Sequence, residues 1–292
     1  MRFRKITVAG VGLLGGSIGL GVKSRGLASR VEGLVRREES VSNCLRLGVV
    51  DGATTAAVEA ARDADLIVLC TPLGQMRPVL EAMLPGIQPG SIVTDVGSVK
   101  ESLVEELDPI AKNAGVEFIG SHPMAGSERT GADWARADLF EKAVCVVTPT
   151  PESTRSSVEQ VEGFWRDLGG IPVRLQAAAH DELVSRSSHL PHVIASALVR
   201  QVLSANHPGE QALLCATGFR DTTRIASGSP EVWRDIARAN RRNLAESLNA
   251  FIQELQAIRR ALEANDTAAL ESFFQSAKQL RDEWTAESRS AA

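Results

Sequence analysis

The feature that most constrains this 292-residue chain is a glycine pattern close to its N-terminus. A short apolar run is followed directly by G-x-G-x-x-G at residues 10–15. In a strand–turn–helix setting, Gly10 allows the tight turn, Gly12 lets the backbone approach a pyrophosphate, and Gly15 lets helix and strand pack closely. The helix N-terminus then favours an anion. We therefore predict that a dinucleotide contacts Gly10, Gly12, Leu13, Leu14 and Gly15.

The first half alternates apolar runs with helical patterns. The apolar runs, which predict parallel strands covered on both faces, are Ile6–Ala9, Val31–Val35, Leu66–Cys70, Ser91–Asp95, Glu117–Gly120, Ala143–Thr148 and Ile171–Leu175. The helical patterns are Gly15–Lys23, Glu38–Leu47, Met76–Leu84, Ser102–Ala114 and Val158–Leu168. This alternation predicts an α/β Rossmann-type, doubly wound, mostly parallel sheet over residues 1–176.

Helical periodicity replaces strands after about residue 177. The predicted helices are Asp181–Leu203, Glu231–Leu262 and Thr267–Glu287. Ser229-Pro230-Glu231 is a good helix start, with a capping hydroxyl, a proline and an acid at the positive end of the dipole. The helix over 231–262 is hard to bury within one small domain, so we expect it to pack against another subunit. Residues 177–292 are thus an all-helical C-terminal domain.

Charge and cysteine usage exclude several classes of protein. The formal net charge of −4 gives no overall positive field to hold nucleic acid or an anionic membrane. The apolar N-terminal run is too short and too rich in glycine for a signal peptide or a membrane span. No CxxC pair or short Cys/His cluster indicates a metal site. We expect a cytoplasmic protein whose reduced, structural cysteines are Cys44, Cys70, Cys145 and Cys215.

The end of the second predicted strand bears on the cofactor. NAD sites usually place an acid there for the ribose 2′-hydroxyl. Here Arg36 takes the place of the acid, Arg37 lies beside it, and Ser40 adds a hydroxyl. A guanidinium matches a 2′-phosphate in charge and geometry, whereas the alternative is a solvated pair balanced by the acids at 38–39. We predict NADP as the preferred cofactor without excluding NAD.

Two further segments follow predicted strands and should border the nicotinamide. Ligands of open α/β sheets gather at the carboxyl ends of the strands. Thr71 and Pro72 follow the third predicted strand, and Gly97 and Ser98 follow the fourth. Ser98 would lie close to the reacting centre, whereas Lys100 opens a helix and is expected at the surface.

His122 is the strongest candidate for a general base. It follows the fifth strand within Gly-Ser-His-Pro-Met-Ala-Gly, next to the predicted cofactor. A loop position and a pKa near neutrality would suit it for proton transfer. His180 and His207 are interpreted as structural.

The helical half contributes a second polar group. His189 and His192 lie in Ser-His-Leu-Pro-His, and Arg220 and Arg224 lie in Gly-Phe-Arg-Asp-Thr-Thr-Arg, interpreted as a loop. On the residues alone, a solvated pair of arginines and an anion-binding pair remain equally open.

Taken in order, these motifs resemble a known family. G-x-G-x-x-G, DVGSVK, SHPMAG, SHLPH and GFRDTTR followed by PEVWRD are similar to those of the prephenate/arogenate (cyclohexadienyl) dehydrogenases of tyrosine biosynthesis. The resemblance covers the chain from Ile6 to about Asp235, and VRREES resembles the NADP-preferring members. It implies a homodimer that decarboxylates prephenate or arogenate oxidatively, with hydride transfer to NAD(P)+ and no metal. The helical domain would then bind substrate and form the dimer.

The resemblance also implies roles for individual residues. His122 is the catalytic histidine that hydrogen-bonds the ring 4-hydroxyl, Ser98 orients it, and Arg224 binds a substrate carboxylate. The resemblance also places other residues at the substrate: Glu128, His189, His192, Arg220 and Trp233. Among these, Glu128 would be a gating partner of Arg224.

Two alternatives remain from other classes. A β-hydroxyacid dehydrogenase or imine reductase shares the layout, but the hydroxyacid enzymes need a lysine in the first helix of the second domain, and residues 181–203 contain none. A non-catalytic NADP-sensing protein is the other, and the intact His122, Ser98 and Arg224 argue against it. The choice between prephenate and arogenate stays open.

Overall fold

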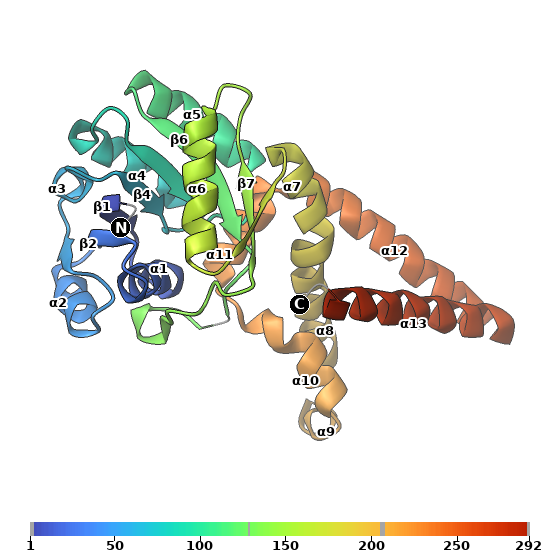
Figure 1. Cartoon of the computed structure of the whole chain (residues 1–292). Coiled ribbons are helices and arrows are strands. Elements are labelled where there is room, and N and C mark those ends of the chain that lie inside the picture. The colour runs from blue at the N-terminus through green and yellow to red at the C-terminus, as the bar shows by residue number, and fades with distance from the viewer. Residues whose placement is uncertain (1–2, 128, 205–207, 291–292) are drawn as a thin grey trace. The chain divides into compact units, whose positions relative to one another are not determined.

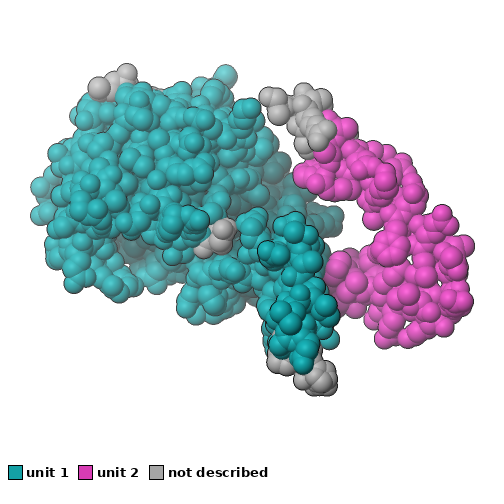
Figure 2. All heavy atoms as spheres, turned by 90° about the horizontal axis from the view of Figure 1, so that it is seen from below, with its two compact units in different colours: residues 1–241 teal, residues 242–292 magenta. Residues whose placement is uncertain are grey.

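The computed structural model describes residues 3–127, 129–204 and 208–290. The chain divides into two compact units, residues 1–241 and 242–292, which Figure 2 colours separately. Within the described residues, no helix is both long and apolar enough to cross a membrane.

Eight strands of the described chain form one sheet in the order β3-β2-β1-β4-β5-β6-β7-β8 (Figure 1). The strands are β1 (Phe3–Ala9), β2 (Ala28–Leu34), β3 (Gly52–Thr54), β4 (Leu66–Leu69), β5 (Ile92–Asp95), β6 (Glu117–Pro123), β7 (Val144–Thr148) and β8 (Ile171–Arg174). All neighbours are parallel except β6 and β7, which are antiparallel. The predicted doubly wound, mostly parallel sheet is confirmed.

Helices cover both faces of this sheet and bury it in two apolar clusters. The helices that contribute to the first cluster are α1 (Leu13–Ser24), α2 (Glu38–Arg46) and α6 (Arg155–Asp167). The helices that contribute to the second are α3 (Ala57–Ala61), α4 (Leu73–Met83) and α5 (Glu101–Asn113). Burial on both faces explains why the strands read as continuous apolar runs.

The sequence patterns missed the short elements and one strand end. β3 and α3 are too short to show a period, and neither was predicted. The expectation that His122 lies in a loop was wrong, because β6 continues to Pro123. Antiparallel pairing with β7 extends it, and His122 pairs with Val146. That pairing joins segments far apart in sequence, so no local signal reveals it.

The remainder of the first unit is helical. Its elements are α7 (Ala177–Val184), the π-turn η3 (Ser185–His189), α8 (Leu190–Leu203), α9 (Pro208–Leu213), α10 (Thr217–Thr223), the 3₁₀ turn η4 (Arg224–Ser227) and α11 (Pro230–Ala239). Ser229 caps α11 by accepting the N–H of Val232, as its sequence predicts. The Gly-Phe-Arg-Asp-Thr-Thr segment forms helix α10, so the prediction of a loop there was wrong.

The long helix expected over 231–262 is in fact two helices. α11 ends at Ala239, and α12 (Arg241–Glu263) begins after Asn240. The side chain of Asn240 is buried and donates to the carbonyl of Asp181, so the break carries a tertiary contact that sequence periodicity does not report. In the second unit, α13 (Thr267–Ser290) follows a turn in which Asn265 has φ +52° and Asp266 caps the helix by accepting the N–H of Ala269.

Candidate active site

The glycine turn after β1 has the form that a bound dinucleotide requires. Gly10 has φ +99°, and a Cβ there would lie 2.9 Å from the backbone carbon of Cys70. A Cβ on Gly15 would lie 2.1 Å from the carbonyl oxygen of Gly10, so neither position accepts a side chain. A Cβ on Gly12 would meet nothing within 4 Å. The turn therefore packs tightly against β4 and α1, yet leaves open space over Gly12 for a ligand.

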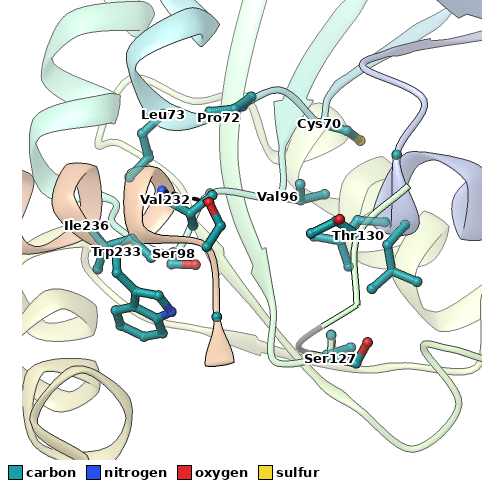
Figure 3. Close-up of a pocket in the computed structure, with 18 of the residues that line it drawn as sticks. Cys70, Pro72, Leu73, Val96, Ser98, Ser127, Thr130, Val232, Trp233 and Ile236 are labelled. Atoms are coloured by element: carbon teal, nitrogen blue, oxygen red, sulfur yellow. Dashed lines mark hydrogen bonds between the residues drawn. The ribbon is translucent and has the colours of Figure 1, made fainter. Parts of the chain in front are cut away.

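A cavity of about 630 Å³ lies at the carboxyl ends of β1, β4, β5 and β6. This is where strand order reverses, β2 and β3 lying on one side of β1 and β4 on the other. In Figure 3, Trp233 and Ile236 of α11 lie on one side of the cavity and Ser127 and Thr130 on the other. The cavity thus lies between the sheet and the helices that follow it in the first unit.

Most of the residues expected at the site meet around this cavity. Those that line it are Gly12, Leu13, Leu14, Thr71, Pro72, Gly97, Ser98, His122, His192, Arg224 and Trp233. Those outside its lining are Gly10, Gly15, Arg36, Arg37, Ser40, His189 and Arg220. Glu128 lies outside the described residues. The lining is therefore drawn from both predicted halves of the chain.

Thr71 supports the fit of a cofactor to the sheet side of the cavity. Its hydroxyl oxygen is buried and has no hydrogen-bond partner among the described residues, although Thr71 lines the cavity. Buried hydroxyls normally find a partner. Together with the open backbone over Gly12, this hydroxyl suits a polar group of a nicotinamide nucleotide, which Thr71, Pro72, Gly97 and the glycine turn would hold.

Lys100 is fully buried, so its expected place at the surface was wrong. Its Nζ pairs with Oδ2 of Asp95, which is also fully buried. Asp95 further accepts the N–H of Gly97 at 2.7 Å and the N–H of Ser121 at 2.9 Å. Burial lowers the pKa of Lys100, and the negative charge of Asp95 opposes that shift. This carboxylate thereby ties the loop after β5 to the strand that carries His122.

His122 is 7% exposed and contacts a second histidine. Its Nδ1 lies 2.9 Å from Nε2 of His180, and Nδ1 of His180 lies 2.7 Å from Oδ1 of Asp181. Burial, then the nearby charges of His180, Lys100 and His189, lowers the pKa of His122 well below its usual value. The near-neutral pKa expected from sequence was wrong, because burial within the extended strand disfavours the charged imidazolium.

His180 and Asp181 were missed as members of the site. The sequence interpretation treated His180 as structural, and a His-Asp pair in the middle of a short helix has no distinctive period or motif. Only the packing of α7 against α5 and β7 brings it to His122.

The helical half presents an aromatic and cationic wall. The His192 ring stacks on Trp233 with centroids 3.4 Å apart and an interplanar angle of 26°. Its Nδ1 lies 3.1 Å from the carbonyl oxygen of Ser188. Burial lowers the pKa of His192, which the Ser188 carbonyl opposes and the charge of Arg224 reinforces. Arg224 also lines the cavity, so this wall offers a guanidinium for an anionic group and a flat surface for a ring.

His189 has a different environment from His192. It is 1% exposed and does not line the cavity. Its Nδ1 lies 3.1 Å from the amide nitrogen of Asn240, and its ring meets Trp233 edge-on with centroids 6.2 Å apart. Burial lowers its pKa to about 4. His189 therefore supports Trp233 and the break between α11 and α12.

Two family descriptions match this chain. Residues 18–173 match the nucleotide-binding domain of prephenate dehydrogenase, and residues 176–276 match the prephenate dehydrogenase dimerization domain. This chain belongs to the prephenate dehydrogenase family. It is therefore an oxidoreductase with a nicotinamide-nucleotide domain, as its motifs predict.

Individual relatives cover almost the whole of this family member. The prephenate dehydrogenase of Bacillus subtilis is 34% identical over 283 residues, 95% of this chain and 75% of the relative. The cyclohexadienyl dehydrogenase of Zymomonas mobilis is 32% identical over 282 residues, 96% of this chain and 95% of the relative. The crystal structure of prephenate dehydrogenase from A. aeolicus with hydroxyphenyl propionate and NAD+ gives a TM-score of 0.90 at 28% identity, covering 97% of this chain and 99% of that one.

The ion pair inside the site predicts a large effect on stability. Lys100→Met should lower the free energy of unfolding by about 3–5 kcal/mol, because it leaves Asp95 as an uncompensated buried charge. Urea unfolding followed by circular dichroism measures this. The matched control is Lys112→Met, at a partly exposed lysine of α5 that pairs with Asp108, and should stay within about 1 kcal/mol of the parent. Equal losses in the two variants would contradict the role given to the pair.

Proposed function

We propose that this chain catalyses the oxidative decarboxylation of prephenate, arogenate or both, with hydride transfer to NADP+ in preference to NAD+. The observation that carries the proposal is one cavity lined by Gly12 of the nucleotide turn, by His122 of β6, by Ser98 of the loop after β5, and by Arg224 from the helical half. The family and its named relatives support the same reaction. When bound, the nicotinamide supplies the hydride acceptor.

His122 acts as the general base. A neutral ring can accept the proton of the 4-hydroxyl as hydride leaves C4 of the cyclohexadiene ring, and the low pKa of His122 keeps that ring neutral before turnover. The ring carboxylate then leaves as CO2, its bonding electrons complete the aromatic ring, and no carbanion has to be stabilised. The phenolate oxygen takes the proton back from His122, which regenerates the base. Ser98 lines the cavity together with His122, and in this proposal its hydroxyl binds the same substrate oxygen.

Arg224 and the stacked pair hold the rest of the substrate. Arg224 binds a substrate carboxylate through charge-assisted hydrogen bonds. Trp233 and His192 form the flat wall against which the substrate lies. His189 and Arg220, with Glu128, complete the proposed substrate set, His189 by supporting Trp233.

The NADP preference rests on the end of β2. The N–H of Gly10 donates to the carbonyl oxygen of Leu34 at 2.9 Å, so the residues after β2 lie directly beside the nucleotide turn. Arg36 and Arg37 are exposed there, and neither forms an ion pair with another described residue. The Glu38 carboxylate instead accepts the hydroxyl of Thr55. Two guanidiniums, with Ser40 nearby, thus remain available for a 2′-phosphate.

We further propose that the chain works as a cytoplasmic homodimer, with a Rossmann domain over 1–176 and a helical domain over 177–292. All four cysteines are free, which suits a reducing compartment. The match to a dimerization domain supports the dimer. Exposed large apolar side chains of residues 177–292 also support it; among them are Leu213, Leu214, Ile252, Leu255, Leu262, Phe274, Leu280 and Trp284.

A four-way initial-rate assay tests the function. Prephenate or arogenate is offered with NADP+ or NAD+, and nicotinamide absorbance is followed. We expect turnover of at least one substrate, faster with NADP+. Arg36→Ala should lower kcat/KM for NADP+ by about 10- to 100-fold and leave NAD+ unchanged, because a charged hydrogen bond contributes about 1.5–3 kcal/mol.

Arg46→Ala, at an exposed arginine near the end of α2, is the matched control and should alter neither cofactor. Folded protein that binds NADP+ but turns over neither substrate would contradict the proposed reaction. Equal losses for both cofactors in Arg36→Ala would contradict the NADP preference.

Two active-site variants should separate chemistry from binding. His122→Asn should lower kcat by about 10²–10⁴-fold with KM nearly unchanged, because the general base is lost. Arg224→Ala should chiefly raise KM, because it removes a contact made before as well as during the reaction. Steady-state kinetics with the substrate that the four-way assay identifies measures kcat and KM for both variants. An unchanged kcat in His122→Asn would remove the base from this account.

A further inference from the structure

A buried chain of hydrogen-bonding groups runs away from the cavity behind His122. It passes from Nδ1 of His122 to Nε2 of His180 at 2.9 Å, and from Nδ1 of His180 to Oδ1 of Asp181 at 2.7 Å. His180 is 0% exposed and Asp181 is 1% exposed. His122 lines the cavity, whereas His180 and Asp181 do not. The two inner groups therefore reach a substrate only through His122.

The carboxylate of Asp181 determines which groups donate and which accept along this row of hydrogen bonds. Its Oδ1 accepts the backbone N–H of Lys100 at 2.8 Å, and its Oδ2 accepts that of Glu101 at 2.9 Å, at the N-terminus of α5. Both oxygens of this carboxylate thus act as acceptors of backbone N–H groups. An ionised carboxylate only accepts, so Nδ1 of His180 must be the donor.

The same reasoning gives the direction of the hydrogen bond between His180 and His122. In a neutral imidazole, one nitrogen donates and the other accepts. With its proton on Nδ1, neutral His180 presents Nε2 as an acceptor. Nδ1 of His122 must then donate, which leaves Nε2 of His122 without a proton. That is the state in which a histidine can take a proton from a substrate.

We propose that His180 and Asp181 are positioning residues that hold His122 with its proton on Nδ1 and its lone pair on Nε2, facing the cavity. This rests on the proposed function, in which His122 is the base. Once His122 has accepted a proton, its Nδ1–H still donates to His180, and the charge of Asp181 stabilises the imidazolium through that ring. The arrangement follows the logic by which a carboxylate sets the tautomer of a catalytic histidine.

Contacts on every side hold His122, His180 and Asp181 in place. The amide of Asn240 donates to the carbonyl oxygen of Asp181 at 2.8 Å and anchors the far end. The other charged and titratable groups near His122 are Lys100 on the α5 side and His189 on the helical side. Asp95 accepts the N–H of Ser121, the residue before His122. Lys100 is already paired with Asp95, and the carboxylate that contacts His180 is that of Asp181.

Nitrogen-15 NMR of histidine-labelled protein reads the tautomer directly. The chain has five histidines, and the loss of one set of signals in His122→Asn assigns that residue. We expect the wild-type His122 ring to carry its proton on Nδ1, and in Asp181→Asn to shift toward the Nε2–H form. A wild-type ring protonated on Nε2 would overturn the proposal. This readout needs no turnover, so it stands even if neither cyclohexadiene is a substrate.

A graded series at His180 separates positioning from packing. The amide oxygen of His180→Gln can still accept from Nδ1 of His122, whereas His180→Leu fills similar space with no acceptor. We expect His180→Leu to lower kcat about 10²-fold at unchanged KM, and His180→Gln to recover about tenfold of that loss, within the range of general-base effects.

Asp65→Asn is the control for Asp181→Asn. Asp65 also accepts two backbone N–H groups, those of Arg4 and Lys5, but lies away from the cavity. Asp65→Asn should leave kcat unchanged, and Asp181→Asn should lower it about 10²-fold or more. Equal kcat in His180→Leu and His180→Gln would overturn the proposal: equal impairment would show a structural role only, and wild-type kcat in both would show that His180 has no role in turnover.

Discussion

The buried pair of Asp95 and Lys100 is the interaction on which the rest of the site depends. A carboxylate and an ammonium without solvent are tolerated only when each is paired and hydrogen-bonded. Asp95 meets this condition by accepting from Lys100 and from the backbone of Gly97 and Ser121. In doing so it fixes the loop that lines the cavity and the strand that carries His122 at the same time.

A second buried carboxylate extends the same design to the helical half. Asp181 binds the start of α5 through two backbone N–H groups and reaches His122 through His180. Its carbonyl is held by Asn240, where α11 and α12 meet, and Asn240 also contacts His189. His122 is thus surrounded by groups that bind two parts of the fold together. Arg224 and the Trp233–His192 stack line the same cavity from the helical half.

The sequence contains the local part of this architecture and omits the non-local part. The glycine turn, the alternation of strands and helices, and the order of the motifs were enough for the fold and the family, because each depends on neighbouring residues. The strand position of His122 depends on pairing with β7, and the burial of Lys100 on a partner in β5. His180 becomes part of the site only when α7 docks beside β6. Contacts between distant segments decide these features, and the periodicity of the sequence does not report such contacts.

The central claim is that Nε2 of His122 receives the proton of the ring hydroxyl. A crystal structure of this chain with NADP+ and hydroxyphenyl propionate, whose phenolic oxygen stands for the substrate hydroxyl, tests it most directly. The account predicts that oxygen within about 2.6–3.2 Å of Nε2, the range of a hydrogen bond to a general base, with Ser98 beside it and the propionate carboxylate toward Arg224. A phenolic oxygen turned away from His122, with the ring reversed in the cavity, would contradict it.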